Sequence, residues 1–183
     1  MITSTIHPLS RRQILFSTLV SVASAALVPE VCTVAALPQP VPVRERPSTT
    51  ENQNRTSLHQ ENTYKVAPQR IYNILLDSRQ FTLFSGSPAE IDSKPGGAFS
   101  MFGGLIVGRN VELIASQRIV QAWRVVDWSA GIYSIARFEL KEQGPQTRLV
   151  FDHIGFPSGK AEHLAAGWKS NYWEPLQKYF AAM

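Results

Sequence analysis

Apolar and polar residues alternate along much of the second half of the chain. From residue 132 to 140, Ile132, Ala136 and Phe138 fall on one side of an extended backbone, while Arg137 and Glu139 fall on the other. Residues 147–154 alternate in the same way, and this period of two is typical of half-buried β-strands. The pattern predicts strands over residues 56–66, 98–102, 105–114, 118–128, 132–140 and 147–154.

Helical periodicity separates the first of these strands from the second. Ile71, Tyr72 and Leu75 share one helical face just after Ala67-Pro68, and proline is well suited to a first helical turn. A second short helix is predicted over residues 78–84. The chain therefore begins its fold with one strand and one or two short helices.

A long amphipathic helix is predicted from Ser158, as its N-cap, to the C-terminus. Pro175 lies inside it and is expected to kink it, because proline cannot donate the backbone hydrogen bond of a helix interior. An antiparallel sheet with helices on one face is an α+β fold, here with the long helix laid across a curved sheet. The apolar stripe that must face the sheet consists of Leu164, Trp168, Tyr172 or Trp173, Leu176 and Phe180.

The first 36 residues have the order of an export signal. Arg11 and Arg12 precede the apolar run Ile14–Val28, and small residues follow at two candidate cleavage sites, after Ala25 or after Ala35. The Ser-Arg-Arg pattern resembles the twin-arginine signal of bacteria, with an ordinary secretory leader and an uncleaved membrane anchor as alternatives. The run is shorter than the ~20 residues of a spanning helix, so we expect no stable membrane span after cleavage. The predicted location is the periplasm, or the extracellular space or a membrane anchor if the leader is retained, and the export machinery is an expected partner.

The remainder of the chain divides into a linker and one domain. Residues 37–56 are rich in proline and polar residues without apolar periodicity, which is typical of a disordered tether. Residues 57–183 carry the predicted elements and are long enough to bury a core of their own. We therefore predict an export signal over 1–36, a linker over 37–56 and a single domain over 57–183.

Charge and cysteine content narrow the classes of partner. The chain has 183 residues and a formal net charge of +4, but residues 57–183 hold 13 Lys and Arg against 11 Asp and Glu, without a basic run. A nucleic-acid interface needs a clustered basic stripe, so nucleic acid is not an expected partner. The single cysteine, Cys32, excludes an internal disulfide, and no His or Cys cluster has metal-ligand spacing. We expect neither a metal nor another cofactor.

Several short motifs in the predicted domain follow one another in the order of a known family. The series spans about residues 58–182 and resembles the activator-of-heat-shock-protein-90-ATPase-homologue-like (AHSA-type) domain of the START-like, helix-grip SRPBCC superfamily. The resemblance implies a curved antiparallel sheet around a long C-terminal helix, with an apolar cavity between them that holds a hydrophobic molecule. In that family, chaperone activation belongs to two-domain eukaryotic relatives, and an exported protein would not meet a cytosolic chaperone. The motifs are Lys94-Pro95-Gly96-Gly97-Ala98-Phe99, Gly103-Gly104, Asn110-Val111-Glu112-Leu113-Ile114, Arg118-Ile119-Val120 with Trp123-Arg124, Thr147-Arg148-Leu149 and Gly167-Trp168.

The candidate ligand-binding residues are those expected to face that cavity. His153 alternates with Leu149 and Phe151 toward the helix, and it is the one candidate general acid or base. Asp152 has the opposite parity, so it cannot pair with His153 within one flat strand. Aromatic residues also fill most protein cores, so a plain core position is the competing interpretation for each candidate. The full set is Phe138, Leu149, Phe151, His153, Trp123, Trp128, Trp168 and Tyr172.

Three functions remain open from the sequence. The first is the binding of a hydrophobic small molecule in an apolar cavity. The second is a cyclase-like or hydratase-like enzyme, which needs His153 to converge with Tyr133, Arg124 or Asp127 in that cavity. The third is a protein-interaction module, which needs a filled cavity and an exposed apolar patch. The volume of the cavity and the polarity of its lining distinguish the three.

Overall fold

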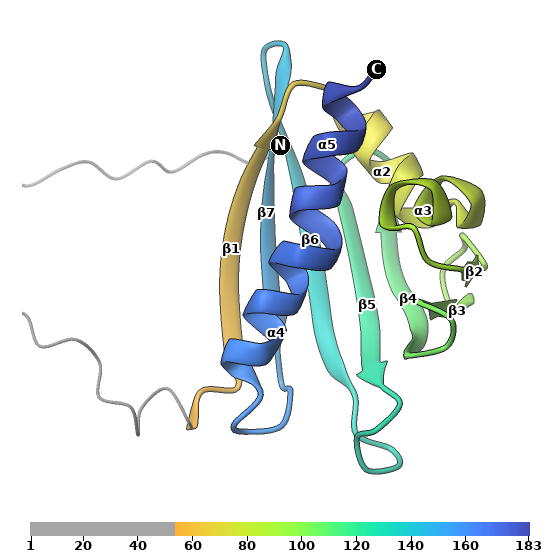
Figure 1. Ribbon diagram of the computed structural model, residues 1–183, viewed down its shortest axis with the longest axis vertical. Coiled ribbons are helices and arrows are strands. Elements are labelled where there is room, and N and C mark those ends of the chain that lie inside the picture. The colour runs from red at the N-terminus through yellow and green to blue at the C-terminus, as the bar shows by residue number, and fades with distance from the viewer. Residues whose placement is uncertain (1–53) are drawn as a thin grey trace, which may run out of the picture. The chain divides into compact units, whose positions relative to one another are not determined.

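The computed structural model describes residues 54–183, so the predicted export signal with Arg11 and Arg12 and nearly all of the predicted linker lie outside the described residues. The described chain forms a seven-stranded antiparallel sheet and a C-terminal helix, which confirms the predicted α+β helix-grip fold (Figure 1). The elements in chain order are β1 (Ser57–Tyr64), α2 (Pro68–Leu76), α3 (Ser78–Ser85), β2 (Ala89–Ile91), β3 (Ala98–Met101), β4 (Ile106–Ile114), β5 (Arg118–Val125), β6 (Ser134–Gln143), β7 (Gln146–Ile154), α4 (Ala161–Trp168), the π-helical turn η1 (Lys169–Trp173) and α5 (Glu174–Ala181).

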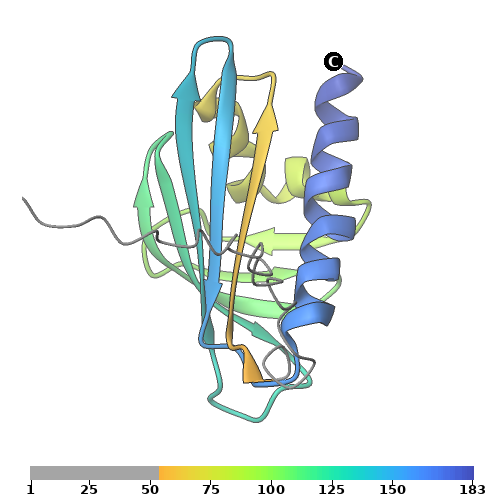
Figure 2. The same cartoon turned by 90° about the vertical axis from the view of Figure 1, so that its left-hand side faces the viewer.

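The strands lie in the order β1-β7-β6-β5-β4-β3-β2. Each strand from β2 to β6 pairs with the next one along the chain, and β1 pairs with β7, from Ser57 opposite Ile154 to Tyr64 opposite Thr147. Figure 2 shows the long strands and the C-terminal helix as two separate layers, side by side. The core of the domain lies between these layers.

Alternation along the long strands separates an inner face, under the helix, from an outer face. On β7, Leu149, Phe151 and His153 are buried, whereas Arg148 and Asp152 are partly exposed on the outer face. The predicted parity of this strand is therefore confirmed. A period of two has sorted apolar and charged side chains onto opposite sides of one sheet.

The C-terminal helix begins later than predicted. Ser158 does not cap it, because the helix starts at Ala161 and its N-cap residue is Lys160, whose side chain makes no capping hydrogen bond. The left-handed backbone of Gly159 (φ 77°) turns the chain between Ser158 and the helix. Glycine adopts this left-handed conformation readily, but it is not helical, so the helix begins only after Gly159.

The C-terminal helix accommodates Pro175 through a π-helical turn. The backbone N–H of Glu174 donates to the carbonyl of Lys169, five residues earlier, and Pro175 then falls in the first turn of α5. A first turn does not need the N–H that proline lacks. The wider turn adds one residue to the helix, and both Tyr172 and Trp173 are buried, where the sequence pattern left a choice between them.

The fifth strand ends earlier than predicted, which resolves the position of Trp128. β5 stops at Val125, and Trp128 lies in the turn that follows. The Arg124 guanidinium donates to the carbonyls of Val126 and Trp128, at 3.2 and 2.7 Å, and so fixes this turn. Trp128 is buried edge-to-face against Trp123, with ring centroids 5.7 Å apart, although strand parity would place them on opposite faces.

Candidate functional site

Aromatic side chains fill most of the space between the helix and the sheet. The Trp168 ring lies at the centre, 4.2 Å from the Phe151 ring and 4.3 Å from the Tyr172 ring, measured between centroids. Trp173 stacks on Trp168 at 5.6 Å, and Phe138 packs edge-to-face on it at 5.8 Å. This packing buries apolar surface of both layers and so holds the helix on the sheet.

His153 lies inside this aromatic cluster and both of its ring nitrogens are engaged. The Ser134 hydroxyl donates to the carbonyl of Trp123 at 3.0 Å, so it accepts a hydrogen bond from His153 Nε2 at 2.6 Å. The Trp168 indole N–H donates to His153 Nδ1 at 3.0 Å. His153 is therefore a neutral imidazole with its proton on Nε2. It ties β6, β7 and α4 together.

Burial lowers the pKa of His153 from 6.5 to about 3. A proton added at Nδ1 would also face the Trp168 N–H, which is a donor with no lone pair to offer. Histidine in this environment does not exchange protons near neutral pH. These contacts favour a structural role for the one residue that the sequence marked as a candidate acid or base.

The other groups that an enzyme would need do not gather around His153. Arg124 is committed to backbone carbonyls of the β5–β6 turn. Tyr133 is 49 % exposed, and Asp127 is an exposed residue of the same turn. Within residues 54–183, the hydrogen bonds of His153 join it to Ser134 and Trp168 and to no second titratable side chain.

A cleft of about 450 Å³ opens beside the aromatic cluster, where α4 and η1 pass the ends of β4 and β5. Apolar residues make up most of its walls, and the polar side chains in the lining are those of Ser87, Asp127, His163 and Asn171. Within the described residues, neither Lys nor Arg lines it. The lining consists of Ser87, Phe102, Leu105, Ile106, Trp123, Val125, Asp127, His163, Leu164, Gly167, Trp168, Asn171 and Tyr172.

Three of the eight predicted ligand-binding residues line this cleft, namely Trp123, Trp168 and Tyr172. The other five are buried in the core outside the lining: Phe138, Leu149, Phe151, His153 and Trp128. The strand residues among these five do face the helix as predicted, but the aromatic rings of the helix occupy the space in front of them. Facing the helix is therefore not sufficient to reach the cleft.

Phe102 is a lining residue that strand and helix patterns did not identify. It lies in the β3–β4 turn with a left-handed backbone (φ 54°), a conformation that is costly for a bulky residue. Its ring packs edge-to-face on Phe81 and on Tyr172, with both centroid distances 5.4 Å. These contacts hold the ring at the cleft wall, and Gly103-Gly104 directly after it was the sequence signal for such a turn.

The buried end of the cleft wall is neutral but not wholly apolar. The Tyr172 hydroxyl donates to the thioether sulfur of Met101 at 3.7 Å, which is a weak acceptor. Burial raises the pKa of Tyr172 above its ordinary value, opposed by the neighbouring Trp123 indole. The phenol therefore stays protonated at neutral pH. The exposed polar residues Asp127 and His163 also line the cleft.

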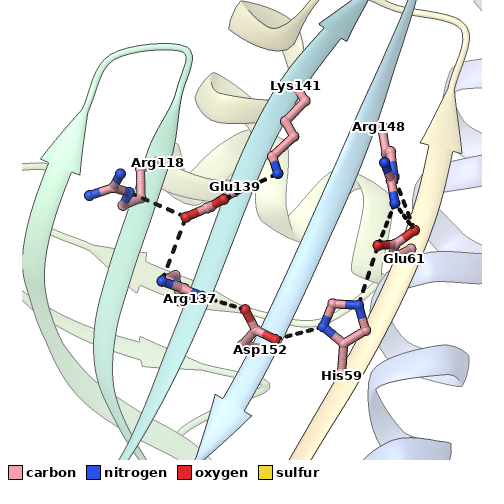
Figure 3. A network of polar contacts seen from close by, with 8 residues as sticks. All are labelled: His59, Glu61, Arg118, Arg137, Glu139, Lys141, Arg148 and Asp152. Carbon is pink, nitrogen blue, oxygen red and sulfur yellow. Dashed lines mark hydrogen bonds and ion pairs between the residues drawn. The ribbon is translucent and has the colours of Figure 1, made fainter. Parts of the chain in front are cut away.

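The outer face of the sheet carries a network of ion pairs (Figure 3). Asp152 accepts from Arg137 and binds the His59 ring, each at 2.7 Å. Two nitrogens of Arg148 contact Glu61, at 2.6 to 3.0 Å, and His59 also reaches Glu61 at 3.3 Å. The sequence placed His59 and Glu61 only at the edge of the domain. Their pairing depends on β1 lying beside β7, which local sequence does not show.

The network shifts the pKa values of its members in opposite directions. Hydrogen bonds to Asp152 and then Glu61 raise the pKa of His59 above 6.5. The Arg148 guanidinium lowers the pKa of Glu61. Burial acts to raise the pKa of Asp152, but hydrogen bonds from Arg137 and His59 outweigh it, and the net shift is downward. All these groups keep their charges near neutral pH more readily than they would alone.

Two further features of the described residues bear on function. No helix within residues 54–183 is long and apolar enough to cross a membrane. The same part of the chain contains no group of three or more His, Cys, Asp or Glu side chains placed to hold a metal ion.

Comparisons with known proteins agree with this architecture. The family model described as activator of Hsp90 ATPase homolog 1-like protein matches residues 65–181. The mouse activator of 90 kDa heat shock protein ATPase homolog 2 is 29% identical over 121 residues, which are 66% of this chain and 37% of that protein. The match thus spans little more than a third of that relative's length.

Solved structures include similar chains. The crystal structure of an HSP90 activator from Plasmodium falciparum has 30% sequence identity and a TM-score of 0.66, covering 69% of this chain and 96% of that one. CalU16 from Micromonospora echinospora has 17% identity and a TM-score of 0.59, covering 68% of this chain and 75% of that one. The second likeness is one of fold alone.

Proposed function

Because the chain belongs to the family of activator of Hsp90 ATPase homolog 1-like proteins, we propose that it acts by non-covalent binding, and that its cleft holds a small hydrophobic molecule. The observation that carries this proposal is the cleft of about 450 Å³ beside the aromatic cluster. That volume lies in the range of ~300–1,000 Å³ that is usual for small-molecule sites. An aromatic lining with a few polar groups is also typical of such sites.

The lining selects against anionic ligands. Neither Lys nor Arg lines the cleft within the described residues, and Asp127 contributes a carboxylate. A carboxylate or phosphate placed there would lose water without gaining an ion pair with Lys or Arg. The favoured ligand is therefore apolar over most of its surface. The end that faces Asp127 and Asn171 is either neutral or carries a hydrogen-bond donor.

Gly167 offers a way to test the cleft without disturbing the core. It lines the cleft from α4, and a Cβ added there would meet only the Asn171 side chain, at 3.8 Å. We expect Gly167→Leu to fill the cleft and abolish retention of a co-purifying hydrophobic molecule in native mass spectrometry. Ala166→Leu, at the next and exposed position of the same helix, is the matched control and is expected to retain the molecule.

Two results would contradict the proposal. One is a protein that carries no small molecule after purification and shows no quenching of tryptophan fluorescence with any of a panel of neutral hydrophobic compounds. The other is equal ligand retention by Gly167→Leu and Ala166→Leu. Trp123 and Trp168 both line the cleft, so an occupied cleft changes their fluorescence directly.

A second candidate function is action on a chaperone of the Hsp90 class. It is favoured by the 30% identity to the Plasmodium falciparum HSP90 activator, of which the match covers 96%. The filled grip, in which aromatic rings occupy the space between helix and sheet, also suits a protein-binding module. The test adds the purified chain to an Hsp90-type ATPase: stimulation of ATP hydrolysis supports this function, and an unchanged rate with no co-sedimentation excludes it for that chaperone.

We further propose that the chain is exported. Support comes from Arg11-Arg12, the apolar run Ile14–Val28 and the small residues that follow. Changing both arginines to lysine keeps the charge but removes the pair that a twin-arginine machinery reads, so export is expected to fail. Fractionation of bacterial cells measures this, and export of the double variant at the normal level would instead indicate an ordinary secretory leader.

A further inference from the structure

β1 forms one border of the sheet. It pairs with β7 on one side, and within residues 54–183 no strand pairs with its other side. Figure 1 shows this strand at the margin of the sheet, with the C-terminal helix over its inner face. An edge strand presents a row of unpaired backbone N–H and C=O groups that can bind another strand.

The register of the sheet shows which residues of β1 direct their backbone groups outward. The backbone N–H of Gly155 donates to the carbonyl of Thr56, so Thr56 faces β7. The two-residue turn between β6 and β7 places Gln143 opposite Gln146, so the backbone groups of Gln146 point toward β6. Counting along β7 from Gln146, the odd-numbered residues point their backbone groups toward β1, which agrees with the direction of Thr56. Backbone direction alternates along a strand. The outward groups therefore belong to the odd-numbered residues Ser57, His59, Glu61 and Thr63.

These outward residues are complementary to themselves. When β1 meets a second β1 in antiparallel fashion about a two-fold axis at Gln60, His59 of each copy lies opposite Glu61 of the other. This register pairs outward residues only with outward residues, as the hydrogen bonds of an antiparallel ladder require. Moving the axis to His59 or to Glu61 sets like charges directly against each other. Charge thus selects the register centred on Gln60.

The outer-face network gives this pairing a second source of complementarity. Across the strands, Arg137, Asp152 and His59 occupy consecutive positions in one row, and their charges alternate in sign (Figure 3). His59 ends that row at the edge of the sheet, and its Nε2 already lies 3.3 Å from Glu61 of its own strand. A second carboxylate beside the imidazole continues the alternation, and the Gln60-centred register supplies Glu61 of the other copy.

We propose that β1 is a self-complementary edge that joins two copies of this chain into one continuous antiparallel sheet about a two-fold axis at Gln60. Charged residues on an edge strand commonly prevent such pairing. Here each charge meets its opposite, so the same residues that reject an unrelated edge accept a second copy. The pairing uses only backbone groups at the edge and side chains of the outer face, so it leaves intact the inner-face contacts of the Gln60 amide with Ala165 and Trp173 of its own helix.

Reciprocal charge variants test the proposal on the full chain. In His59→Glu, glutamate faces Glu61 of the other copy; in Glu61→Lys, lysine faces His59. Each single variant is expected to raise the dimer dissociation constant by about tenfold or more in sedimentation equilibrium, since two attractive pairs become repulsive. An equimolar mixture of the two variants restores both pairs and is expected to return the dimer, as a heterodimer.

A variant without charge change separates pairing from electrostatics. Thr63 is exposed, and its N–H points away from β7, so Thr63→Pro removes an outward donor at a position where an edge strand tolerates proline. We expect this variant to keep the far-UV circular dichroism of the parent and to unfold cooperatively, but to sediment as a monomer. A parent chain that is monomeric at high concentration would overturn the proposal. So would single charge variants that dimerise normally, or a mixture that stays monomeric. The proposal would also be overturned if β1 bound a different protein but did not pair with β1 of a second copy.

Discussion

The inner and outer faces of the sheet differ in what their side chains contribute, although residues of the two faces alternate along the same strands. On β7, Phe151 and His153 lie in a close-packed aromatic cluster, while Asp152 between them and Arg148 of the same strand lie among solvated ion pairs. Burial of aromatic surface on the inner face supplies stability. Ion pairs on the outer face supply little, because water screens them. They contribute instead to which strand edge the sheet accepts.

Two histidines show the difference between the faces most directly. Burial lowers the pKa of His153 to about 3, so the inner face keeps it neutral. Hydrogen bonds to two carboxylates raise the pKa of His59, so the outer face favours its cation. The same side chain is a structural connector in one place and a charge in the other, and its surroundings alone make the difference.

Removing the central ring of the inner face is expected to have the largest effect. Trp168 is 2 % exposed and contacts Phe138, Phe151, Tyr172 and Trp173. Trp168→Ala opens a cavity and leaves His153 Nδ1 without its donor. We expect a loss of ~3–5 kcal/mol in the free energy of unfolding, measured in urea. A loss below ~1 kcal/mol would contradict the packing described here.

Lowering the pH is expected to reduce the stability of the fold through protonation of His153 on the inner face. Its pKa is 6.5 when unfolded and about 3 when folded, so the unfolded chain binds the proton first as the pH falls. The stability that the neutral imidazole contributes is therefore complete above pH 6.5 and is lost progressively down to about pH 3, by roughly 3–5 kcal/mol. His153→Gln is neutral throughout and is expected to flatten this part of the stability curve. An unchanged slope would contradict this assignment.

His59 on the outer face is expected to give the opposite slope. Its raised pKa means that its contribution is fully present below 6.5 and is lost as the pH rises through the folded value. The side chain is 57% exposed, so the effect is small and falls with added salt. His59→Gln measured between pH 6 and 9 at low and high salt checks the sign. Stability that rises with pH in the parent but not in the variant would contradict it.

Replacing Gly167 on the inner side of the sheet is expected to raise the free energy of unfolding moderately. It lies inside α4, where glycine costs helical stability, and an added Cβ meets only Asn171 at 3.8 Å. We expect Gly167→Ala to raise the free energy of unfolding by about 0.5–1 kcal/mol. Thermal unfolding measures it. A loss of stability would mean that the cleft wall has no room for a methyl group.

The smallest expected effect lies on the outer face. Arg137 pairs with Asp152 at 2.7 Å, but the arginine side chain is 47% exposed. We expect Arg137→Ala to cost less than ~1 kcal/mol, and most of that loss to disappear in 1 M salt. A loss equal to that of Trp168→Ala would show that the outer face contributes as much stability as the inner face.

Most of the fold was predictable because strand and helix periodicity is local. The alternation in residues 147–154 placed every inner-face residue of β7 correctly, and Ala67-Pro68 marked the start of α2. The errors occur where tertiary contacts override the local pattern. β5 ends before Trp128 because Arg124 captures the carbonyls of the turn, and the π-helical turn buries both Tyr172 and Trp173.

The candidate site was predictable only in part. Trp123, Trp168 and Tyr172 line the cleft, since the period of their elements directs them between helix and sheet. Phe102 and Gly167 were not identified, because a turn residue and a glycine carry no apolar period. Whether an inward residue meets open space or another ring depends on the rings across from it. That information is distributed over segments far apart in the chain.

By itself, the sequence determined which residues turn inward and which turn outward, because that choice needs only the geometry of a single strand or helix. It also determined the family, through the order of its motifs. Tertiary structure alone decided that the aromatic cluster fills the grip and leaves a cleft at one end. It alone brought His59 and Glu61 of β1 beside Asp152 and Arg148 of β7. Such contacts join residues about ninety positions apart, and only the path of the folded chain brings them together.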